Sequence, residues 1–160
     1  CQEWEAESRQ AEDFGARVVL PRIGVVLTKD GGALEKMLTP FKFGVGGTIG
    51  SGGQWMSWIA IDDLIRIFHF ALENAELSGT VNAVAPNPVT NEEFTKTFGK
   101  VLHRPTILPI PAFGIKLLFG EMGETLLLEG ARILPEKLIK AGFEFQFADL
   151  EKAMQHVLEG

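Results

Sequence analysis

ARVVLPRIGVVL, residues 16–27, is β-branched and apolar along nearly its whole length. Such a run is typical of a strand that is buried on both faces of a parallel sheet. Pro21 cannot donate a ladder hydrogen bond and Gly24 relaxes the backbone, so we expect a bend or a bulge in this strand. The stretch favours an α/β fold.

Helices and strands alternate around this strand. An acidic helix over residues 2–14 precedes it and should end at Gly15, because glycine is common just past a helix C-terminus. The elements expected next are a helix at 33–43, a short strand at 58–61, a helix at 64–74 that is buried between layers, and a short strand at 79–84. This alternation indicates α/β. One long strand and at most three short ones are fewer than the roughly five or six of an average sheet, so part of the sheet should be missing from this chain.

The second half of the chain is expected to be mainly helical. Thr90 and Glu93 have the spacing of a capping box, which predicts a helix over residues 91–102. The elements expected after it are a long apolar helix at about 112–128, a short helix from Pro135 to Gly142, an extended or strand-like segment with Phe143, Phe145 and Phe147 on one face, and a last helix at 149–158.

Residues 43–63, FGVGGTIGSGGQWMSWIAIDD, join a glycine-rich loop to two tryptophans and two aspartates. The loop lacks the lysine of a nucleotide P-loop, and it does not lie between a strand and a helix with GxGxxG spacing. We therefore expect a mobile lid or a hairpin on the substrate side. Gln54, Trp55 and Trp58 are the candidate pocket residues, because amide and indole groups suit small-molecule sites. A packing role remains open for both tryptophans.

Several polar residues have a structural interpretation that competes with a functional one. Asp62 and Asp63 precede an apolar helix, where carboxylates accept hydrogen bonds from unpaired N–H groups, so we interpret the pair as a helix cap. Arg22 is interpreted as a strand-end cation whose head reaches solvent, with a buried guanidinium that holds a carboxylate or a carbonyl cluster as the alternative. The three histidines lie apart from one another and from other ligand residues, so we assign no metal site.

Composition excludes some classes of partner. The 160 residues are 46% hydrophobic and carry a net charge of −6, with no run of lysine or arginine. This charge gives no electrostatic basis for binding nucleic acid or a membrane surface. We expect a small molecule as the partner.

Cys1 is the only cysteine, which is consistent with a reducing compartment, and we expect a cytoplasmic location. A chain that begins at Cys rather than Met is expected to be a fragment. A lipid-anchored terminus is the disfavoured alternative, because the residues after Cys1 have the pattern of a helix rather than that of a flexible tether.

Five segments carry a resemblance to a known family: RVVLPRIGVVL, DGGALEKML, GSGGQWMSWIAIDDL, LSGTVNAVAPNPVTNEEF and ILPEKLIKAGFEF. Together they resemble the C-terminal part of the epimerase-like, atypical extended short-chain dehydrogenases/reductases, which belong to the NAD-dependent epimerase/dehydratase family and end in a C-terminal domain of unknown function. The resemblance implies part of a Rossmann-like fold. Residues 1–85 would be a remnant of the nucleotide-binding sheet with the substrate-side loop 43–63, and residues 86–160 would form a small helical subdomain.

The same resemblance implies an NADP or NAD cofactor in the full-length protein. Arg22, Gly24 and Val25 would lie near the nicotinamide, and the glycine-rich cofactor turn would lie upstream. The family's catalytic lysine corresponds to Cys1, and the chain contains no tyrosine, so we assign no catalytic residue and expect no tight cofactor binding by this chain.

Two further positions depart from the family pattern. Met56 stands where sugar-nucleotide epimerases carry an arginine for the substrate diphosphate, and Ala60 stands where the family usually has a histidine. A thioether cannot neutralise a phosphate charge, so Met56 argues against that substrate class.

The favoured function is therefore the substrate-side part of an NAD(P)-dependent epimerase or oxidoreductase that is inactive alone. The alternative is part of a non-catalytic nucleotide-binding regulatory module. Because a sheet without its neighbouring strands exposes an apolar edge, we also expect the fragment to self-associate.

Overall fold

An extended stretch crosses the molecule and changes its partner strand at Gly24. In the computed structural model, which describes residues 2–107 and 130–159, β1 (Val19–Ile23) pairs in parallel with β5 (Gly79–Ala83). After Gly24, β2 (Val25–Leu27) pairs in parallel with β4 (Trp58–Ala60). The predicted strand is confirmed in two pieces, with the predicted bend at Gly24.

Close packing explains a glycine at this crossing. The Gly24 N–H donates to the Ala83 carbonyl at 3.2 Å, and the next N–H, of Val25, donates to the Ser57 carbonyl at 2.8 Å. A Cβ on Gly24 would meet the Ser57 carbonyl oxygen and would lie 2.8 Å from Val84 Cγ1. Gly24 therefore lets one extended segment serve two different strand pairs.

The remaining elements follow the predicted order closely. They are α1 (Gln2–Arg9), the 3₁₀ helix η1 (Gln10–Phe14), α2 (Gly32–Lys42), β3 (Trp55–Met56), α3 (Ile61–Glu73), β6 (Val89–Thr90), α4 (Asn91–Leu102), α6 (Glu136–Lys140) and α7 (Leu150–Glu159). β3 and β6 pair antiparallel, and Gly15 ends η1 with a φ of 78° as predicted. No strand forms around Phe143, Phe145 and Phe147, so the extended segment is the correct alternative there. The helix predicted at 112–128 lies outside the described residues, as does Cys1.

Two hydrophobic clusters hold the elements together. One lies among α2, β4, α4 and α7 and contains large side chains such as Phe41, Trp58 and Phe94. The other joins α3, β5 and α6 through residues that include Ile67, Val81 and Leu138. Each cluster draws residues from both sides of position 85, where we expected the domain boundary.

Burial at the N-terminal end is lower than the sequence predicted. β1 is half-buried over its first three residues and exposed at Arg22 and Ile23, because β5 is its only strand partner among the described residues. Helix α3 was expected to be buried between layers, yet Ile65, Phe68 and Leu72 are exposed on it. These apolar side chains lie at helical spacing and form one unpartnered side of α3.

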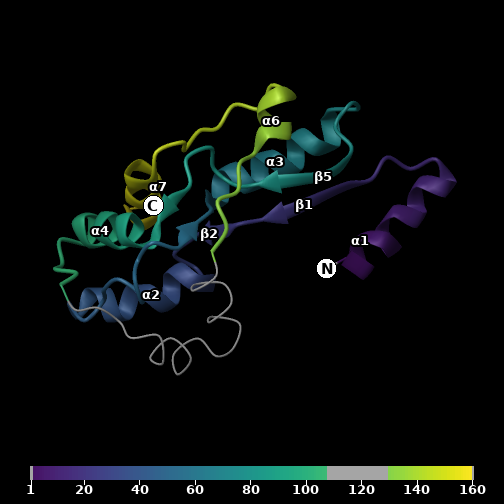
Figure 1. Cartoon of the computed structure of the whole chain (residues 1–160). Coiled ribbons are helices and arrows are strands. Elements are labelled where there is room, and N and C mark those ends of the chain that lie inside the picture. The colour runs from purple at the N-terminus through teal and green to yellow at the C-terminus, as the bar shows by residue number, and fades with distance from the viewer. Residues whose placement is uncertain (1, 108–129, 160) are drawn as a thin grey trace.

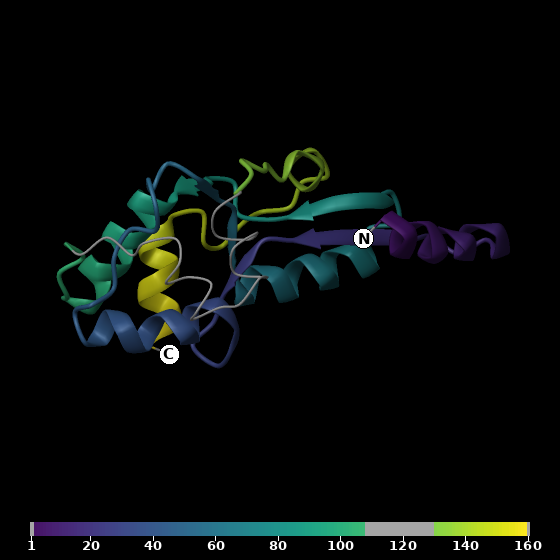
Figure 2. The ribbon, with the colours of Figure 1, turned by 60° about the horizontal axis from the view of Figure 1, so that its bottom comes forward.

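Figure 1 shows the consequence for the shape of the molecule. β1 and β5 run side by side out of the helical body formed by α2, α4 and α7. Helix α1 stands away from that body beyond the strands, as the turned view in Figure 2 also shows. Its Trp4 is 82% exposed, and Phe14 in η1 is 90% exposed.

Asp63 does not cap a helix, contrary to our prediction. The N-cap of α3 is Ala60 and has no side-chain capping bond, whereas Asp63 lies in the first turn and is fully buried. Its carboxylate accepts hydrogen bonds from the Gln146 and Phe147 N–H groups at 2.9 and 2.8 Å, and Arg66 Nη1 lies 2.7 Å from Oδ1. The carboxylate is therefore an anchor for a distant part of the chain.

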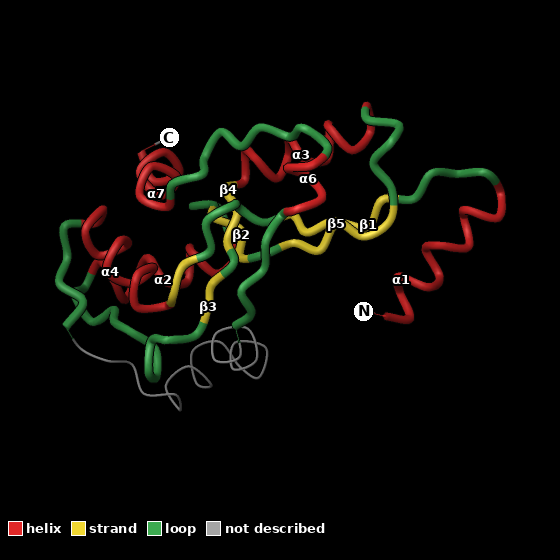
Figure 3. The backbone as a smooth tube through the Cα atoms, turned by 45° about the horizontal axis from the view of Figure 1, so that its top comes forward, coloured by secondary structure: helices red, strands yellow, loops and turns green. Residues whose placement is uncertain are grey.

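Three other polar side chains anchor the same part, residues 130–148, which we call the closing segment. The Ser57 hydroxyl donates to the Ala131 carbonyl at 2.8 Å and accepts from the Ile133 N–H at 3.0 Å. Asn82 donates to the Leu134 carbonyl, and Asn87 donates to the Ala148 carbonyl. Figure 3 shows the closing segment as loop on both sides of α6, which explains why side chains replace a strand ladder here.

The capping box at α4 matches its prediction. The Thr90 hydroxyl accepts from the Glu93 N–H at 3.2 Å, and the Glu93 carboxylate accepts from the Thr90 N–H at 2.8 Å. We expect Thr90→Ala to lower the free energy of unfolding by about 1 kcal/mol, because one of these N–H groups loses its acceptor. Urea unfolding followed by circular dichroism measures this, with Thr97→Ala inside α4 as the control. An equal effect of both substitutions would contradict the capping role.

Within residues 2–107 and 130–159, no helix has the length and apolar content needed to cross a bilayer.

Candidate functional site

The glycine-rich loop is bound to the start of α4. The Ile49 N–H donates to Asn91 Oδ1 at 2.8 Å, and the Asn91 and Glu92 N–H groups donate to the Gln54 and Gly52 carbonyls. A Cβ on Gly46 would collide with the Phe41 ring, and one on Gly52 would collide with Thr48. Gly46 and Gly52 therefore serve close packing, and the hydrogen bonds to the start of α4 argue against a mobile lid.

The three predicted pocket residues have different environments. Trp58 is fully buried in the core, and its indole N–H donates to the Asn87 carbonyl at 3.0 Å, so it offers no surface to a ligand. Gln54 is half-buried and its amide donates to the Ile49 carbonyl. Trp55 is half-buried in β3, directly opposite Thr90 of β6. Of the two tryptophans, only Trp55 is partly exposed.

The three predicted cofactor residues lie together where β1 passes into β2. Gly24 and Val25 hold this crossing through their backbone, whereas Arg22 points to α1. Its guanidinium donates two hydrogen bonds to the Glu5 carboxylate, at 2.7 and 2.8 Å. Arg22 therefore fits the interpretation as a strand-end cation, since its side chain is 59% exposed; it also binds a carboxylate, but not as a buried guanidinium.

This ion pair gives the N-terminal helix a pH-dependent contact. The hydrogen bond from Arg22 holds the pKa of Glu5 below its ordinary value of 4.5, and the same bond raises the pKa of Arg22. A lowered folded-state pKa means that the contact stabilises the protein above about pH 4.5 and is lost as the pH falls through the folded value.

We therefore expect the unfolding midpoint in urea to be lower for Glu5→Gln than for the parent chain near pH 7, and the two to converge as the pH falls through the folded-state pKa of Glu5. Glu7→Gln on the same helix is the control, because the Glu7 carboxylate accepts from the neutral Gln10 amide. A difference between parent and Glu5→Gln that persists unchanged at low pH would contradict the ion pair.

Both positions that depart from the family pattern are buried. Met56 is 2% exposed and its sulfur accepts from the Asn91 amide at 3.3 Å, while Ala60 is fully buried. A side chain at position 56 faces the core in this structure, so the presence of methionine there says little about the charge of a substrate.

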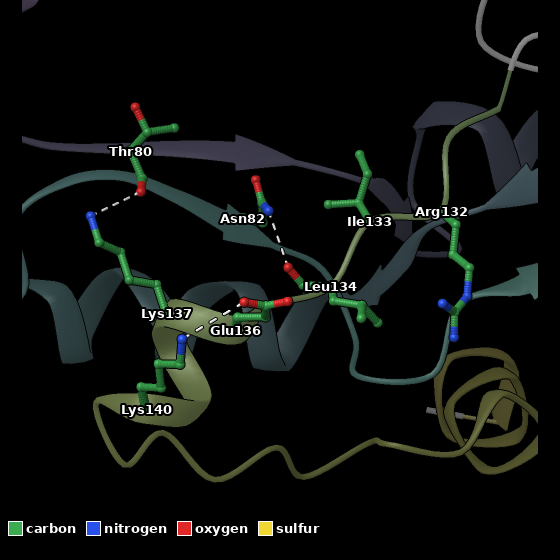
Figure 4. Close-up of a pocket in the computed structure, with 8 residues that line it drawn as sticks. All are labelled: Thr80, Asn82, Arg132, Ile133, Leu134, Glu136, Lys137 and Lys140. Carbon is green, nitrogen blue, oxygen red and sulfur yellow. Dashed lines mark hydrogen bonds and ion pairs between the residues drawn. The ribbon is translucent and has the colours of Figure 1, made fainter.

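Sequence reasoning missed a hollow of about 500 Å³ beside the closing segment. Figure 4 shows its lining from β5, the closing segment and α6: Thr80, Asn82, Arg132, Ile133, Leu134, Glu136, Lys137 and Lys140. The guanidinium carbon of Arg132 lies 5.2 Å from the centre of the Trp55 ring. No local pattern in the sequence pointed to this contact, because it joins residues that are far apart along the chain.

The described residues contain no group of three or more histidine, cysteine, aspartate or glutamate side chains that could hold a metal ion.

Comparison with known proteins identifies proteins that are similar to this chain. A family model described as a domain of unknown function, DUF1731, matches residues 110–157. The epimerase family protein YfhF of Bacillus subtilis is 45% identical over 155 residues, which are 97% of this chain and 50% of that protein. Over the part that it spans, this chain is similar to the epimerase family proteins. The chain covers about half the length of the curated family members that it matches.

Solved structures of the epimerase family agree with this assignment. The human epimerase family protein SDR39U1, solved with NADPH, has a TM-score of 0.85 and 41% identity over 90% of this chain and 49% of that one. A nucleoside-diphosphate sugar epimerase from Corynebacterium glutamicum has a TM-score of 0.77 and 37% identity over 99% of this chain and 30% of that one. The predicted α/β fold of a Rossmann-like extended reductase is confirmed by these relatives.

Proposed function

We propose that this chain is the substrate-side half of an NAD(P)-dependent epimerase or oxidoreductase and that it is inactive without a nucleotide-binding half. The observation that carries the proposal is its close structural match to about half of a relative that was solved with NADPH. In this proposal Arg22, Gly24 and Val25 lie toward the nicotinamide, and Gln54 and Trp55 lie toward the substrate. Trp58 supports the substrate side from the core.

The described residues do not fit a complete dinucleotide site. Phosphate groups are commonly held by free backbone N–H groups in a glycine-rich turn. In the glycine-rich loop these N–H groups have protein acceptors: Gly44, Val45, Gly46, Ile49, Gly52 and Gly53 all donate within the chain. These residues alone therefore do not hold a cofactor for a catalytic step. In this proposal a nucleotide-binding half supplies the phosphate cradle.

The edge of β1 is suited to such a half. Among the described residues β1 pairs only with β5, so its other edge is available for a parallel strand. Apolar hollows lie on both sides of that edge, one bordered by Trp4 and Leu20 and one by Phe68 and Leu72. A docked half that supplied a strand and a helix would cover both hollows.

Titration calorimetry tests the proposal directly. We expect no NADPH binding by the 160-residue chain at low micromolar concentration, and binding at that level would overturn the proposal. A chimera that joins the remaining half of the Bacillus subtilis relative to this chain should bind NADPH. The matched control is the same chimera with Gly24→Arg, which should disrupt the β1 to β2 crossing.

The chimera also separates the two function classes. Oxidation of NADPH with an aldehyde or a ketone would support an enzyme. NADPH binding without turnover of any carbonyl substrate would favour the nucleotide-binding regulatory module, for which Cys1 at the position of the family's catalytic lysine is the supporting observation.

We also propose that the chain self-associates when no other half covers its exposed apolar surface. Ile65, Phe68 and Leu72 on α3 lie next to the open β1 edge, and exposed apolar patches favour association. Light scattering should give a mass above that of the monomer for the parent chain. The double variant Phe68→Glu with Leu72→Glu should give the monomer mass. Val45→Glu, at another exposed apolar position, should not change the parent's mass. A strictly monomeric parent at high concentration would exclude this behaviour.

A cytoplasmic location is proposed from the single cysteine, and fractionation of the source cells with an antibody to the chain would test it.

A further inference from the structure

The hollow beside the closing segment has positive side chains in a protein whose net charge is −6. Among the described residues, Arg132, Lys137 and Lys140 line it with Glu136 as the only acid. Figure 4 shows the two lysines on α6 at one end of the hollow and Arg132 on the closing segment at the other. The positive side chains are therefore divided between two ends of the hollow.

The lysine end is occupied by contacts within the protein. Lys137 Nζ donates to the carbonyls of Ser78 and Thr80 at 2.6 and 3.2 Å. Lys140 lies 3.8 Å from the Glu136 carboxylate. The Lys137 contacts attach α6 to β5, whereas the Lys140 contact lies within α6, so both ammonium groups already face oxygens of the protein.

Arg132 differs from the other arginines in the described part of the chain. The guanidinium groups of Arg9, Arg17, Arg22, Arg66 and Arg104 each donate a hydrogen bond to a protein oxygen. Within residues 2–107 and 130–159 the Arg132 guanidinium has no hydrogen-bond acceptor. It makes a cation–π contact with the Trp55 ring instead. An arginine above an aromatic face keeps the N–H groups on its edge free to donate.

Both partners in this contact are held in place. Trp55 lies in β3, where it is paired with Thr90 of β6. Arg132 lies between Ala131 and Ile133, whose carbonyl and N–H are both bound by the Ser57 hydroxyl. The guanidinium is therefore presented by a segment whose backbone is anchored on either side of it, which lowers the entropy lost when a ligand binds.

We propose that Arg132, supported by the Trp55 ring, binds an anionic group of a small molecule, either a carboxylate or a phosphate. The planar guanidinium can donate two parallel hydrogen bonds to either group. Ile133 and Leu134 give the adjoining wall an apolar part. That this molecule is the substrate rests on the proposed function, since Trp55 is one of its substrate-side residues. Anion binding itself requires neither cofactor nor turnover.

Tryptophan fluorescence provides the test. In a Trp4→Phe background the remaining indoles are Trp55, beneath Arg132, and the fully buried Trp58. Inorganic pyrophosphate, malonate and glucose are titrated at constant ionic strength. We expect a saturable change with at least one anion and none with glucose. Arg132→Gln should weaken binding of that anion at least tenfold, and Arg132→Lys should weaken it by less.

Lys152→Gln is the matched control, because it removes one positive charge from an exposed position on α7. It should leave the anion affinity within twofold of the parent, and all variants should keep the parent's urea midpoint. The anion that binds more tightly identifies the chemistry as phosphate or carboxylate. The proposal is overturned by the lack of a saturable response to both anions, or by equal losses in Arg132→Gln and Lys152→Gln. A negative NADPH titration would not bear on this result.

Discussion

Asp63→Asn should lower the free energy of unfolding by about 3 kcal/mol, although it changes only one atom of a buried side chain. The carboxylate has two acceptor oxygens that serve the Gln146 and Phe147 N–H groups, and it also pairs with Arg66. An asparagine offers one acceptor oxygen, so one N–H of the closing segment would face another donor. Arg66 would also lose its charge partner.

Urea unfolding at neutral pH measures this loss, and the neighbouring residue supplies the control. Asp62 is 43% exposed and lies 3.3 Å from His156, so Asp62→Asn should cost less than about 1 kcal/mol. Similar losses in the two variants would mean that Asp63 does not anchor the closing segment. Hydrogen exchange should show lost protection at the N–H groups of residues 146 and 147 in Asp63→Asn.

Gly24→Ala should cost about 2–3 kcal/mol, which is near the upper end for added bulk in a packed interior. The new methyl group would meet the backbone oxygen of Ser57, which cannot move without disturbing β4, and it would also press on Val84. The loss comes from close packing rather than from an unusual backbone angle, since Gly24 is not among the glycines with positive φ.

Gly53→Ala is the matched control for this prediction. Its φ is also not positive, and a Cβ at that position would have Ser51 Oγ as its nearest neighbour at 3.7 Å, so the substitution should be nearly neutral. Thermal and urea unfolding of both variants measures the difference. A Gly24→Ala chain as stable as Gly53→Ala would show that the crossing tolerates a side chain.

The features that the sequence predicted well depend on neighbouring residues. The capping box needs only Thr90 and Glu93, and the helix end at Gly15 needs only one glycine. The bend at Gly24 was also visible locally. Its exchange of strand partners was not, because those partners lie near residues 57 and 83.

The errors concern residues whose environment is made by distant parts of the chain. Asp63 has the local pattern of a cap, but its hydrogen-bond partners lie 83 and 84 residues further on. Trp58 has an indole that would suit a pocket, but it is fully buried in the cluster that β4 forms with residues of α2, α4 and α7. No sequence pattern marked Arg132 as a site residue, because its proposed role depends on the contact with Trp55 and on the lack of a hydrogen-bond acceptor among the described residues.

The anchoring of the closing segment also bears on how this family can vary. Ser57, Asp63, Asn82 and Asn87 bind backbone N–H and C=O groups of that segment, and every residue other than proline supplies both groups. Mutations that alter the side chains at positions 131, 134, 146 and 148 leave the backbone groups there able to form these hydrogen bonds. Loss of the polar group from one of the four anchoring residues removes the hydrogen bonds that this residue makes. Natural selection on these hydrogen bonds should therefore act on the anchoring side chains and not on the side chains of the closing segment. The lining of the hollow beside them can then diverge between relatives while the path of the chain stays the same.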